Sequence, residues 1–321
     1  MSDLQATEEL NVKASQLDII GDVHGCANTL QRLLQKLDYQ KVAGVYRNPQ
    51  RKVVFVGDIV DRGPRIREAL AIVRDMVDAG EATMVLGNHE LHALCYCLPN
   101  PNIPNHYLRP HTPRNTSIIQ ETLEQFANHS QDWQDHLRWL KQRPLYFQMP
   151  GVRVIHACWD QSVINRLAAV IPEARWSELA DPASQLSRDV KRLTSGVELP
   201  LPEPHIMLSA EGYRRRSFRA GFWQSNPVNL GALAFQPDPL PDSVAALPVT
   251  DDIKAQLVVY DSSQPPLFVG HYWLNGSPKP ITENIACLDY SAVKFGRLVA
   301  YRCDGRQTLH PNQYNWVYVD P

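Results

Sequence analysis

The feature of this chain that most constrains its fold is a short apolar run that ends abruptly in a polar, often glycine-bearing cluster, and it occurs five times. Runs of this length that are rich in Val and Ile and bounded by turn residues are typical of buried strands. The five runs are found at residues 17–20, 53–56, 83–86, 152–155 and 267–269. With 321 residues, the chain is long enough to bury a large core around such strands.

Amphipathic stretches separate the first three runs. Apolar residues recur at helical spacing between residues 30 and 37, and again between residues 70 and 77. Alternation of strand and helix predicts parallel βαβ units and therefore an α/β fold. Because ligands of open α/β sheets gather outside the carboxyl ends of the strands, we expect the five polar clusters to converge on one site.

The middle of the chain predicts a different kind of structure. Residues 160–195 have helical character with a break at Pro172, whereas eight prolines fall between residues 200 and 248. Prolines are unfavourable in helix interiors and central strands. We therefore expect a single domain over residues 1–321, in which residues 160–264 form a helical and then proline-rich insertion that packs as a cap without a core of its own.

The C-terminal part again favours strands. Residues 283–291 and 296–305 read as a closing pair of β-strands, joined near Lys294. This pair suggests a second sheet beside the first.

Composition narrows the possible partners and location. The formal net charge is only −2, so no global charge bias indicates long nucleic acids, and no DNA partner is expected. Residues 1–16 lack the basic start and apolar centre of a secretory signal, and no apolar run approaches the ~18 residues that span a bilayer. Six cysteines lack zinc-type paired spacing. We expect a cytoplasmic protein with reduced thiols and no membrane partner.

The polar clusters carry side chains that bind metal ions. Asp22 and His24 are two residues apart at a strand exit, so an extended backbone would point both the same way. The other exits add one more carboxylate, an amide oxygen and two imidazoles. The predicted ligand set is Asp22, His24, Asp58, Asn88, His156 and His271. Mixed nitrogen and oxygen donors without a thiolate suit two divalent ions of Mn, Fe or Zn, with Mn expected first.

The motifs around these residues resemble those of the calcineurin-like metallophosphoesterases, and within them the phosphoprotein phosphatase branch. The similarity lies in GDVHG, GDIVDRG, GNHE, VIHA and VGH, which follow in that order between residues 21 and 271. The resemblance implies a four-layer α/β/β/α sandwich with two central mixed sheets flanked by helices. It also implies that Asp22, His24 and Asp58 hold one ion. The second ion would be held by Asp58, Asn88, His156 and His271.

The same resemblance implies a mechanism. A hydroxide that bridges the two ions would attack phosphorus in line, and His89 would protonate the leaving oxygen as general acid. Asp61 would orient His89, and Arg62 would bind phosphate oxygens through its planar fork of donors. Asp61, Arg62 and His89 are therefore the expected catalytic residues.

A second phosphate-binding arginine of the branch is not identified by any motif. The candidates are Arg188, Arg192 and the cluster of Arg214, Arg215, Arg216 and Arg219. Arg215, Arg216 and Arg219 could form a substrate clamp, and the alternative is a solvated loop face.

Three functions are open at this point. The first is hydrolysis of phosphate monoesters, with a phosphorylated protein (Ser, Thr or Tyr) or a small phosphate ester as partner. The second is a nucleotide or RNA-end phosphohydrolase, including a diadenosine tetraphosphatase or phosphodiesterase. The third, a non-catalytic scaffold, is disfavoured because no ligand and no acid is missing. Substrate choice depends on the cap and the loops around the site rather than on the fold.

Overall fold

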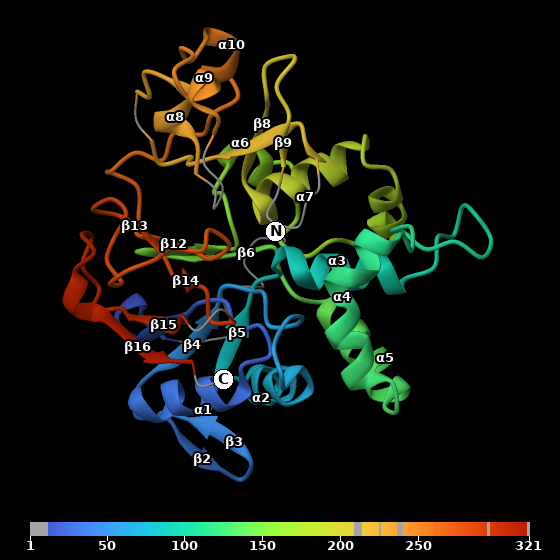
Figure 1. The fold of residues 1–321 in the computed structure, drawn as a ribbon. Coiled ribbons are helices and arrows are strands. Elements are labelled where there is room, and N and C mark those ends of the chain that lie inside the picture. Colours follow the sequence, from blue (N-terminus) through green and yellow to red (C-terminus); the bar gives the residue numbers. More distant parts are fainter. Residues whose placement is uncertain (1–11, 209–213, 225, 236–239, 294–295, 320–321) are drawn as a thin grey trace.

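The structure is a computed structural model that describes residues 12–208, 214–224, 226–235, 240–293 and 296–319. Two mixed β-sheets lie at its centre (Figure 1). In the first sheet, three parallel strands are joined at one edge by antiparallel strands, in the order β14-β15-β1-β4-β5, and β16 pairs with the outer side of β15. The parallel strands are β1 (Leu17–Ile20), β4 (Lys52–Phe55) and β5 (Ala82–Met84), and the others are β14 (Asp289–Tyr290), β15 (Arg297–Arg302) and β16 (Tyr314–Tyr318).

The second sheet has the order β13-β12-β7-β6. Its strands are β6 (Tyr146–Met149), β7 (Val152–Ile155), β12 (Leu267–Val269) and β13 (Ile285–Cys287). β12 is parallel to both β7 and β13, whereas β6 is antiparallel to β7. The five apolar runs of the sequence therefore form three strands of one sheet and two of the other.

Alternating side chains of the two sheets meet in an apolar layer between them. Ile19 and Val54 from the first sheet and Val154 and Phe268 from the second belong to this buried cluster. The intervening residues, such as Phe55, point to the larger cluster that contains the helix side chains. Period-two alternation with both faces buried is what strands packed on two sides require.

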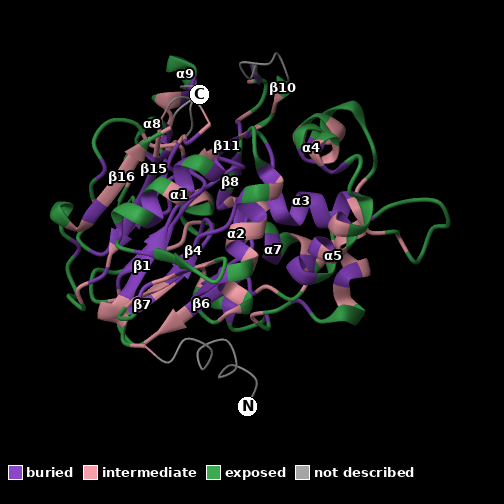
Figure 2. Ribbon diagram, turned by 90° about the horizontal axis from the view of Figure 1, so that it is seen from below, coloured by how far each residue is buried: buried purple, intermediate pink, exposed green. Residues whose placement is uncertain are grey.

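Helices cover the outer faces. α1 (Ala27–Lys36) and α2 (Ile66–Asp78) pack on the first sheet, because their leucines, valines and methionine face its outer residues. α7 (Gln185–Ser195) lies beside the second sheet, and the Leu193 carbonyl accepts the N–H of Ala157 just beyond β7. Figure 2 shows the strands buried at the centre and exposed residues at the rim. The predicted α/β class with two mixed sheets flanked by helices is confirmed.

The remaining helical elements surround this centre. They are η1 (Ala14–Gln16), α3 (Asn88–Cys97), α4 (Pro113–Phe126), α5 (Ser130–Leu140), α6 (Gln161–Ile164), η2 (Glu173–Ala180) and η3 (Pro311–Gln313). Pro172 is the N-cap of η2, at the helix break that the sequence predicts. A hairpin of β2 (Gln40–Val42) and β3 (Val45–Arg47) forms a separate two-stranded sheet that contacts α2. None of the helices in the described residues is long and apolar enough to cross a membrane.

In its described residues, the proline-rich segment contains two two-stranded antiparallel sheets, which pair β8 with β11 and β9 with β10, and three one-turn helices. The elements are β8 (Val197–Pro200), β9 (Met207–Leu208), β10 (Arg214–Arg215), β11 (Ser217–Ala220), α8 (Leu230–Leu233), α9 (Asp242–Ala245) and α10 (Asp251–Lys254). Its buried side chains, among them Phe218 and Leu230, belong to the same hydrophobic cluster as the outer faces of the sheets. Rings of Trp223 and Phe235 pack edge-on against Tyr272, 4.8 and 5.6 Å between centroids.

The expectation for the C-terminal strand pair is wrong in one respect. β14 and β15 do pair antiparallel, but they extend the first sheet, and the second sheet is built around β7 and β12. The reason is a crossing at Leu288, where the chain leaves β13 in the second sheet and enters β14 in the first. The backbone N–H of Leu288 donates to Val269 of the second sheet. The expected join near Lys294 lies outside the described residues.

Candidate metal centre

The loops that follow β1, β4, β7 and β12 carry five of the predicted ligands, and Asn88, the first residue of α3, follows the loop after β5. The carboxyl ends of the parallel strands lie at one edge, so these loops meet. Several non-glycine residues adopt the left-handed region here, including His24 (φ 43°), Asp58 (φ 52°) and His271 (φ 72°). Such conformations cost free energy and tend to cluster at functional sites.

Two glycines make room for the carboxylates. A Cβ atom on Gly270 would lie 2.0 Å from Oδ1 of Asp22, and one on Gly87 would lie 2.1 Å from Oδ1 of Asp58. The glycines of the GNHE and VGH motifs therefore let the carboxylates of Asp58 and Asp22 lie closer to the backbone than any residue with a side chain would allow.

Asp58 is the central group of the site. Its Oδ2 lies 3.4 Å from Nε2 of His156, 3.6 Å from Nε2 of His24 and 4.0 Å from Nε2 of His89. Its Oδ1 accepts the backbone N–H of His89 at 3.0 Å. Asp58 is 2% exposed, so a carboxylate out of water is surrounded by three imidazoles.

Asn88 and Asp22, which follow strands of the first sheet, contact the ligands that follow strands of the second sheet. Oδ1 of Asn88 lies 3.0 Å from Nε2 of His156 and 2.8 Å from Nδ1 of His271. Oδ2 of Asp22 accepts the backbone N–H of His271 at 3.1 Å. All six predicted ligands are thus linked to one another by direct contacts.

Backbone carbonyls fix two of the rings. Nδ1 of His24 is 2.9 Å from the Val60 carbonyl oxygen, and Nδ1 of His156 is 2.8 Å from that of Val56. A carbonyl can only accept, so Nδ1 carries a proton and Nε2 is the ring nitrogen that faces Asp58. This arrangement is how proteins orient histidines that bind metal ions.

Burial and charge set the protonation of the site. Burial alone would raise the pKa of Asp58, but His156 and the other imidazoles hold it well below its usual value. Burial, aided by Arg62, holds the pKa of His24 well below its usual value, and burial aided by Arg219 does the same for His271. Burial would lower the pKa of His156, but Asp58 and Asp22 raise it to about 10. Because a cation binds to ionised carboxylates and neutral imidazoles, His156 would release its proton when the metal binds.

Unpartnered atoms also fit a cation. Oδ1 of Asp22 and Nε2 of His271 are buried without a hydrogen-bond partner among the described residues. Buried polar atoms without partners are costly, and a metal ion would satisfy both. Two sets of donor atoms lie within 4.8 Å of one another, namely Asp22, Asp58 and His156 in one set and His24, Asp58 and His89 in the other. Asp58 belongs to both sets, as expected of a bridging ligand, although the division of the histidines differs from the one the resemblance implies.

His89 belongs to a second network. Its Nδ1 lies 2.6 Å from Oδ2 of Asp61, and Oδ1 of Asp61 accepts the hydroxyl of Thr122 on α4 at 2.5 Å. Burial raises the pKa of Asp61 to about 8 and lowers the pKa of His89 to about 4. Burial thus disfavours an ion pair between His89 and Asp61.

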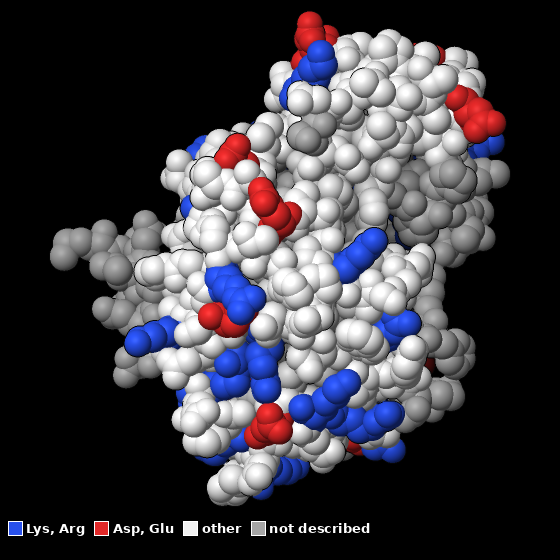
Figure 3. Space-filling view, turned by 90° about the vertical axis from the view of Figure 1, so that its left-hand side faces the viewer, with Lys and Arg blue, Asp and Glu red and all other residues white. Residues whose placement is uncertain are grey.

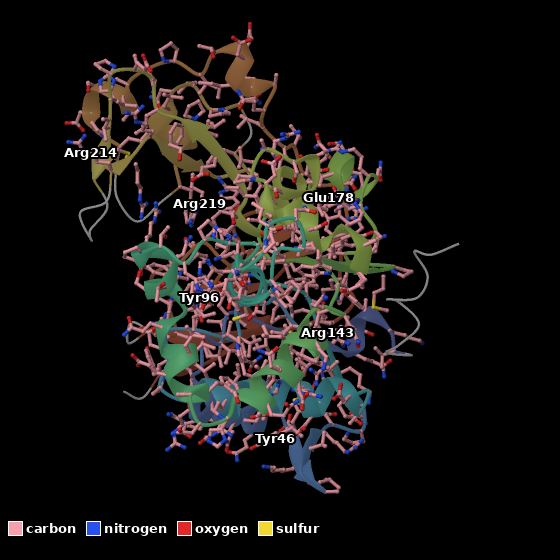
Figure 4. The ribbon with its side chains drawn as sticks, turned by 90° about the vertical axis from the view of Figure 1, so that its right-hand side faces the viewer. Tyr46, Tyr96, Arg143, Glu178, Arg214 and Arg219 are labelled. Atoms are coloured by element: carbon pink, nitrogen blue, oxygen red, sulfur yellow. The ribbon has the colours of Figure 1, made fainter. Side chains whose placement is uncertain are left out.

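Two arginines, Arg62 and Arg219, contact predicted ligands. Arg62 is exposed, its Nη1 lies 3.3 Å from Nε2 of His24, and its guanidinium stacks on the ring of Trp273. Arg219 on β11 donates to the carbonyl oxygen of His271 at 3.5 Å. Figure 4 shows Arg219 nearer the middle of the molecule and Arg214 at the outer edge of its upper part.

The other candidate arginines lie elsewhere. Arg192 pairs with Asp160 at 3.1 Å, and Arg188 bonds to Gln185 on its own helix. Arg215 is in the β9–β10 hairpin and half-buried, and Arg216 is exposed. Arg219 is therefore a member of the cluster that contacts a predicted ligand, and the clamp of Arg215, Arg216 and Arg219 stays a prediction.

Three residues of the site were not predicted from the sequence. Thr122 holds Asp61, the buried Glu90 accepts backbone N–H groups of the Asp58 loop, and the buried Asp289 holds the turn after His271. Glu90 lies inside the GNHE motif and could have been singled out there. Thr122 and Asp289 stand in no motif, so only the folded chain reveals them.

Comparisons with known proteins agree with this geometry. Residues 16–170 match the family described as calcineurin-like phosphoesterase. A bis(5'-nucleosyl)-tetraphosphatase PrpE [asymmetrical] of Oceanobacillus iheyensis is 33% identical over 154 residues, which are 47% of this chain and 59% of that protein. A symmetrical bis(5'-nucleosyl)-tetraphosphatase of Thioalkalivibrio sulfidiphilus is 31% identical over 158 residues, 47% of this chain and 50% of that protein.

Among solved structures, a cold-active protein-tyrosine phosphatase of a psychrophilic Shewanella species is 18% identical, with a TM-score of 0.47 and coverage of 95% of this chain and 80% of that one. The chain spans between half and three fifths of the length of the two curated relatives above. The matched region contains five of the six predicted ligands and the whole His89–Asp61–Arg62 group. The chain therefore carries, over residues 16–170, a calcineurin-like phosphoesterase domain.

Proposed function

We propose that this protein is a metal-dependent phosphohydrolase that cleaves phosphate esters. The observation that carries the proposal is the buried Asp58 carboxylate, which faces three imidazoles beside the unpartnered atoms of Asp22 and His271. Two divalent ions held there would neutralise charge on a phosphate and activate water. The six residues that would hold them are Asp22, His24, Asp58, Asn88, His156 and His271.

The side chains around the ions have separate tasks in this proposal. His89, with its Nδ1 held 2.6 Å from Asp61, would give a proton to the leaving oxygen. Arg62 would bind phosphate oxygens from the exposed side, and Arg219 would do so from β11 beside His271. Arg219 is thus our candidate for the second phosphate-binding arginine.

The first candidate substrate is a phosphate monoester, with a phosphorylated protein as the expected partner. Support comes from two arginines beside two different predicted ligands, Arg62 at His24 and Arg219 at His271, since a terminal phosphoryl group offers several oxygens to such forks of donors. The rings of Trp223 and Phe235 in the proline-rich segment pack on Tyr272, the residue after His271.

A nucleotide is the second candidate substrate, and the names of the relatives favour it, since both are bis(5'-nucleosyl)-tetraphosphatases. One face of the molecule also gathers Lys and Arg side chains over its lower half (Figure 3), which would attract a polyanion. The segment between residues 171 and 264 lies outside the family match. Its side chains would decide which of the two candidate substrates binds.

The experiment compares substrates on metal-depleted protein reloaded with Mn. Hydrolysis of p-nitrophenyl phosphate, bis-p-nitrophenyl phosphate, diadenosine tetraphosphate and a phosphopeptide is measured, also with Fe and Zn. Asp58→Asn should lose activity by more than about 100-fold, whereas Asp251→Asn, which changes a carboxylate that is 96% exposed, should not. A preference for the monoester or phosphopeptide supports the first candidate, and a preference for the dinucleotide supports the second. Equal activity of metal-free and Mn-loaded protein would refute the proposal.

A further inference from the structure

The guanidinium of Arg62 stacks on the indole ring of Trp273. The guanidinium carbon of this exposed arginine lies 4.6 Å from the centre of the Trp273 ring. Its Nη1 is 3.3 Å from Nε2 of His24. A guanidinium that stacks through its flat face keeps the N–H groups at its edge available for hydrogen bonds.

Trp273 is fixed by the backbone as well as by packing. It adopts a left-handed conformation with φ 46°, two residues after the predicted ligand His271. Its backbone N–H donates to Oδ2 of Asp289 at 3.0 Å, and the N–H of Leu274 donates to the Asp289 carbonyl. Asp289 is 1% exposed and also accepts the N–H of Ser291. A tryptophan conformation of this kind is maintained only where the surroundings determine it.

We propose that Trp273 is a positioning residue that holds the guanidinium of Arg62 in the orientation that binds a phosphate. An exposed arginine side chain has several rotatable bonds and would otherwise sample many directions. The ring fixes the plane of the guanidinium, so that the edge with its donors points toward His24 and the metal centre. This inference rests on the proposed function, because it assigns a task to Arg62 in that site.

Removal of the ring should weaken phosphate binding without changing the metal centre. A cation–π contact at an exposed site corresponds to roughly a two- to fivefold effect on binding. We therefore expect Trp273→Leu to raise the KM for p-nitrophenyl phosphate and the inhibition constant of inorganic phosphate by roughly two- to fivefold, with kcat changed less. Trp273→Phe, which keeps an aromatic face, should recover most of the loss.

A double-mutant cycle with Arg62→Ala tests whether the two residues act together. If Trp273 acts through Arg62, Trp273→Leu should have less than about a twofold further effect in the Arg62→Ala background. Trp316→Leu is the matched control, since Arg297 lies 5.8 Å from that ring in the β15–β16 strand pair, and it should leave both constants unchanged. Independent, multiplying effects of Trp273→Leu and Arg62→Ala would overturn the proposal, as would a wild-type inhibition constant for Trp273→Leu.

Calorimetric titrations separate this inference from the function on which it rests. Mn binding to Trp273→Leu should match that of the wild type, and a loss of Mn binding would overturn the proposal, because the ring would then act on the ligands. Phosphate binding to the Mn-loaded protein can be titrated even if no ester is hydrolysed. Absence of hydrolysis by the wild type would thus refute the proposed function, whereas the phosphate titrations alone decide the role of Trp273.

Discussion

The hydroxyl of Thr122 donates to Oδ1 of Asp61 at 2.5 Å, while the other oxygen of Asp61 lies 2.6 Å from Nδ1 of His89. Thr122 also accepts the backbone N–H of Asp61 at 3.1 Å, and it is fully buried on α4. The orientation of His89 therefore depends on a side chain that stands 33 residues further along the chain, outside every recognisable motif.

Thr122→Val should lower activity and stability together. Valine has nearly the same shape but leaves the Asp61 N–H and one carboxylate oxygen without a partner, which costs about 1–3 kcal/mol of unfolding free energy. A misoriented His89 should lower kcat about tenfold, a part of what general acid catalysis contributes. Urea unfolding and kcat for p-nitrophenyl phosphate measure the two effects. Thr122→Ser should restore both, and a wild-type kcat for the valine variant would contradict the role of the hydroxyl.

Glu90→Gln should destabilise the loop that carries Asp58. The two oxygens of Glu90 accept the N–H groups of Gly87, Asp58, Ile59 and Val60 at 2.7 to 3.1 Å. An amide keeps the shape but turns two donors toward backbone donors, so about 2–4 kcal/mol of stability should be lost. Chemical denaturation gives the stability and calorimetry the Mn affinity, which should also fall. Glu68→Gln, on the exposed surface of α2, should change neither quantity.

The strands and the convergence of the loops follow from local patterns. Apolar runs with polar exits predict β1, β4 and β5 and the edge where their loops meet, since parallel strands point the same way. The break at Leu288 could not be predicted in this manner. The residues before and after Leu288 have the same strand-like pattern. That β13 and β14 belong to different sheets is therefore visible only in the folded chain.

The side chains that support the site escape prediction for a related reason. Thr122, Trp273 and Asp289 are ordinary residues until the fold places them beside Asp61, Arg62 and the turn after His271. The arginine cluster shows the same limit. Four arginines between residues 214 and 219 look alike in sequence, and strand β11 alone brings Arg219 to the carbonyl of His271.

Arg219→Ala and Arg216→Ala should therefore differ. Loss of the Arg219 guanidinium removes a donor beside His271, and we expect the KM for a phosphate ester to rise about tenfold, the size of one charge-assisted hydrogen bond. Arg216 is exposed and should be nearly neutral on substitution. Steady-state kinetics of the two single variants are sufficient. Equal effects of both would favour a diffuse basic loop rather than a specific contact.

The thiols should react slowly in the folded protein. Burial raises the pKa of Cys26 and Cys95 to about 11 and that of Cys158 to about 12, so the thiolate fraction at pH 8 is at least about 100-fold smaller than for an exposed cysteine. Labelling with a disulfide reagent should be about 100-fold faster in urea than in buffer. The half-buried Cys97 should react first in the native state, and rapid labelling of Cys26 would contradict the buried placement.

Gly270→Ala should weaken metal binding. Gly270 does not need a left-handed backbone, so only space is at issue: the new Cβ would lie 2.0 Å from Oδ1 of Asp22 and 2.9 Å from Val56. Both neighbours are buried, so Asp22 or the turn before His271 must move, and Mn affinity should fall at least about tenfold, as when the support of a ligand is lost.

The matched control for this substitution is Gly276→Ala in the same loop. Gly276 has φ 79°, and no atom lies within 4 Å of the position that its new Cβ would take, so the change should cost about 1 kcal/mol of stability with unchanged Mn affinity. Calorimetric titration with Mn and thermal unfolding of both variants give the comparison. If Gly270→Ala bound Mn like the wild type, the close packing of that turn on Asp22 would not be what shapes the metal centre.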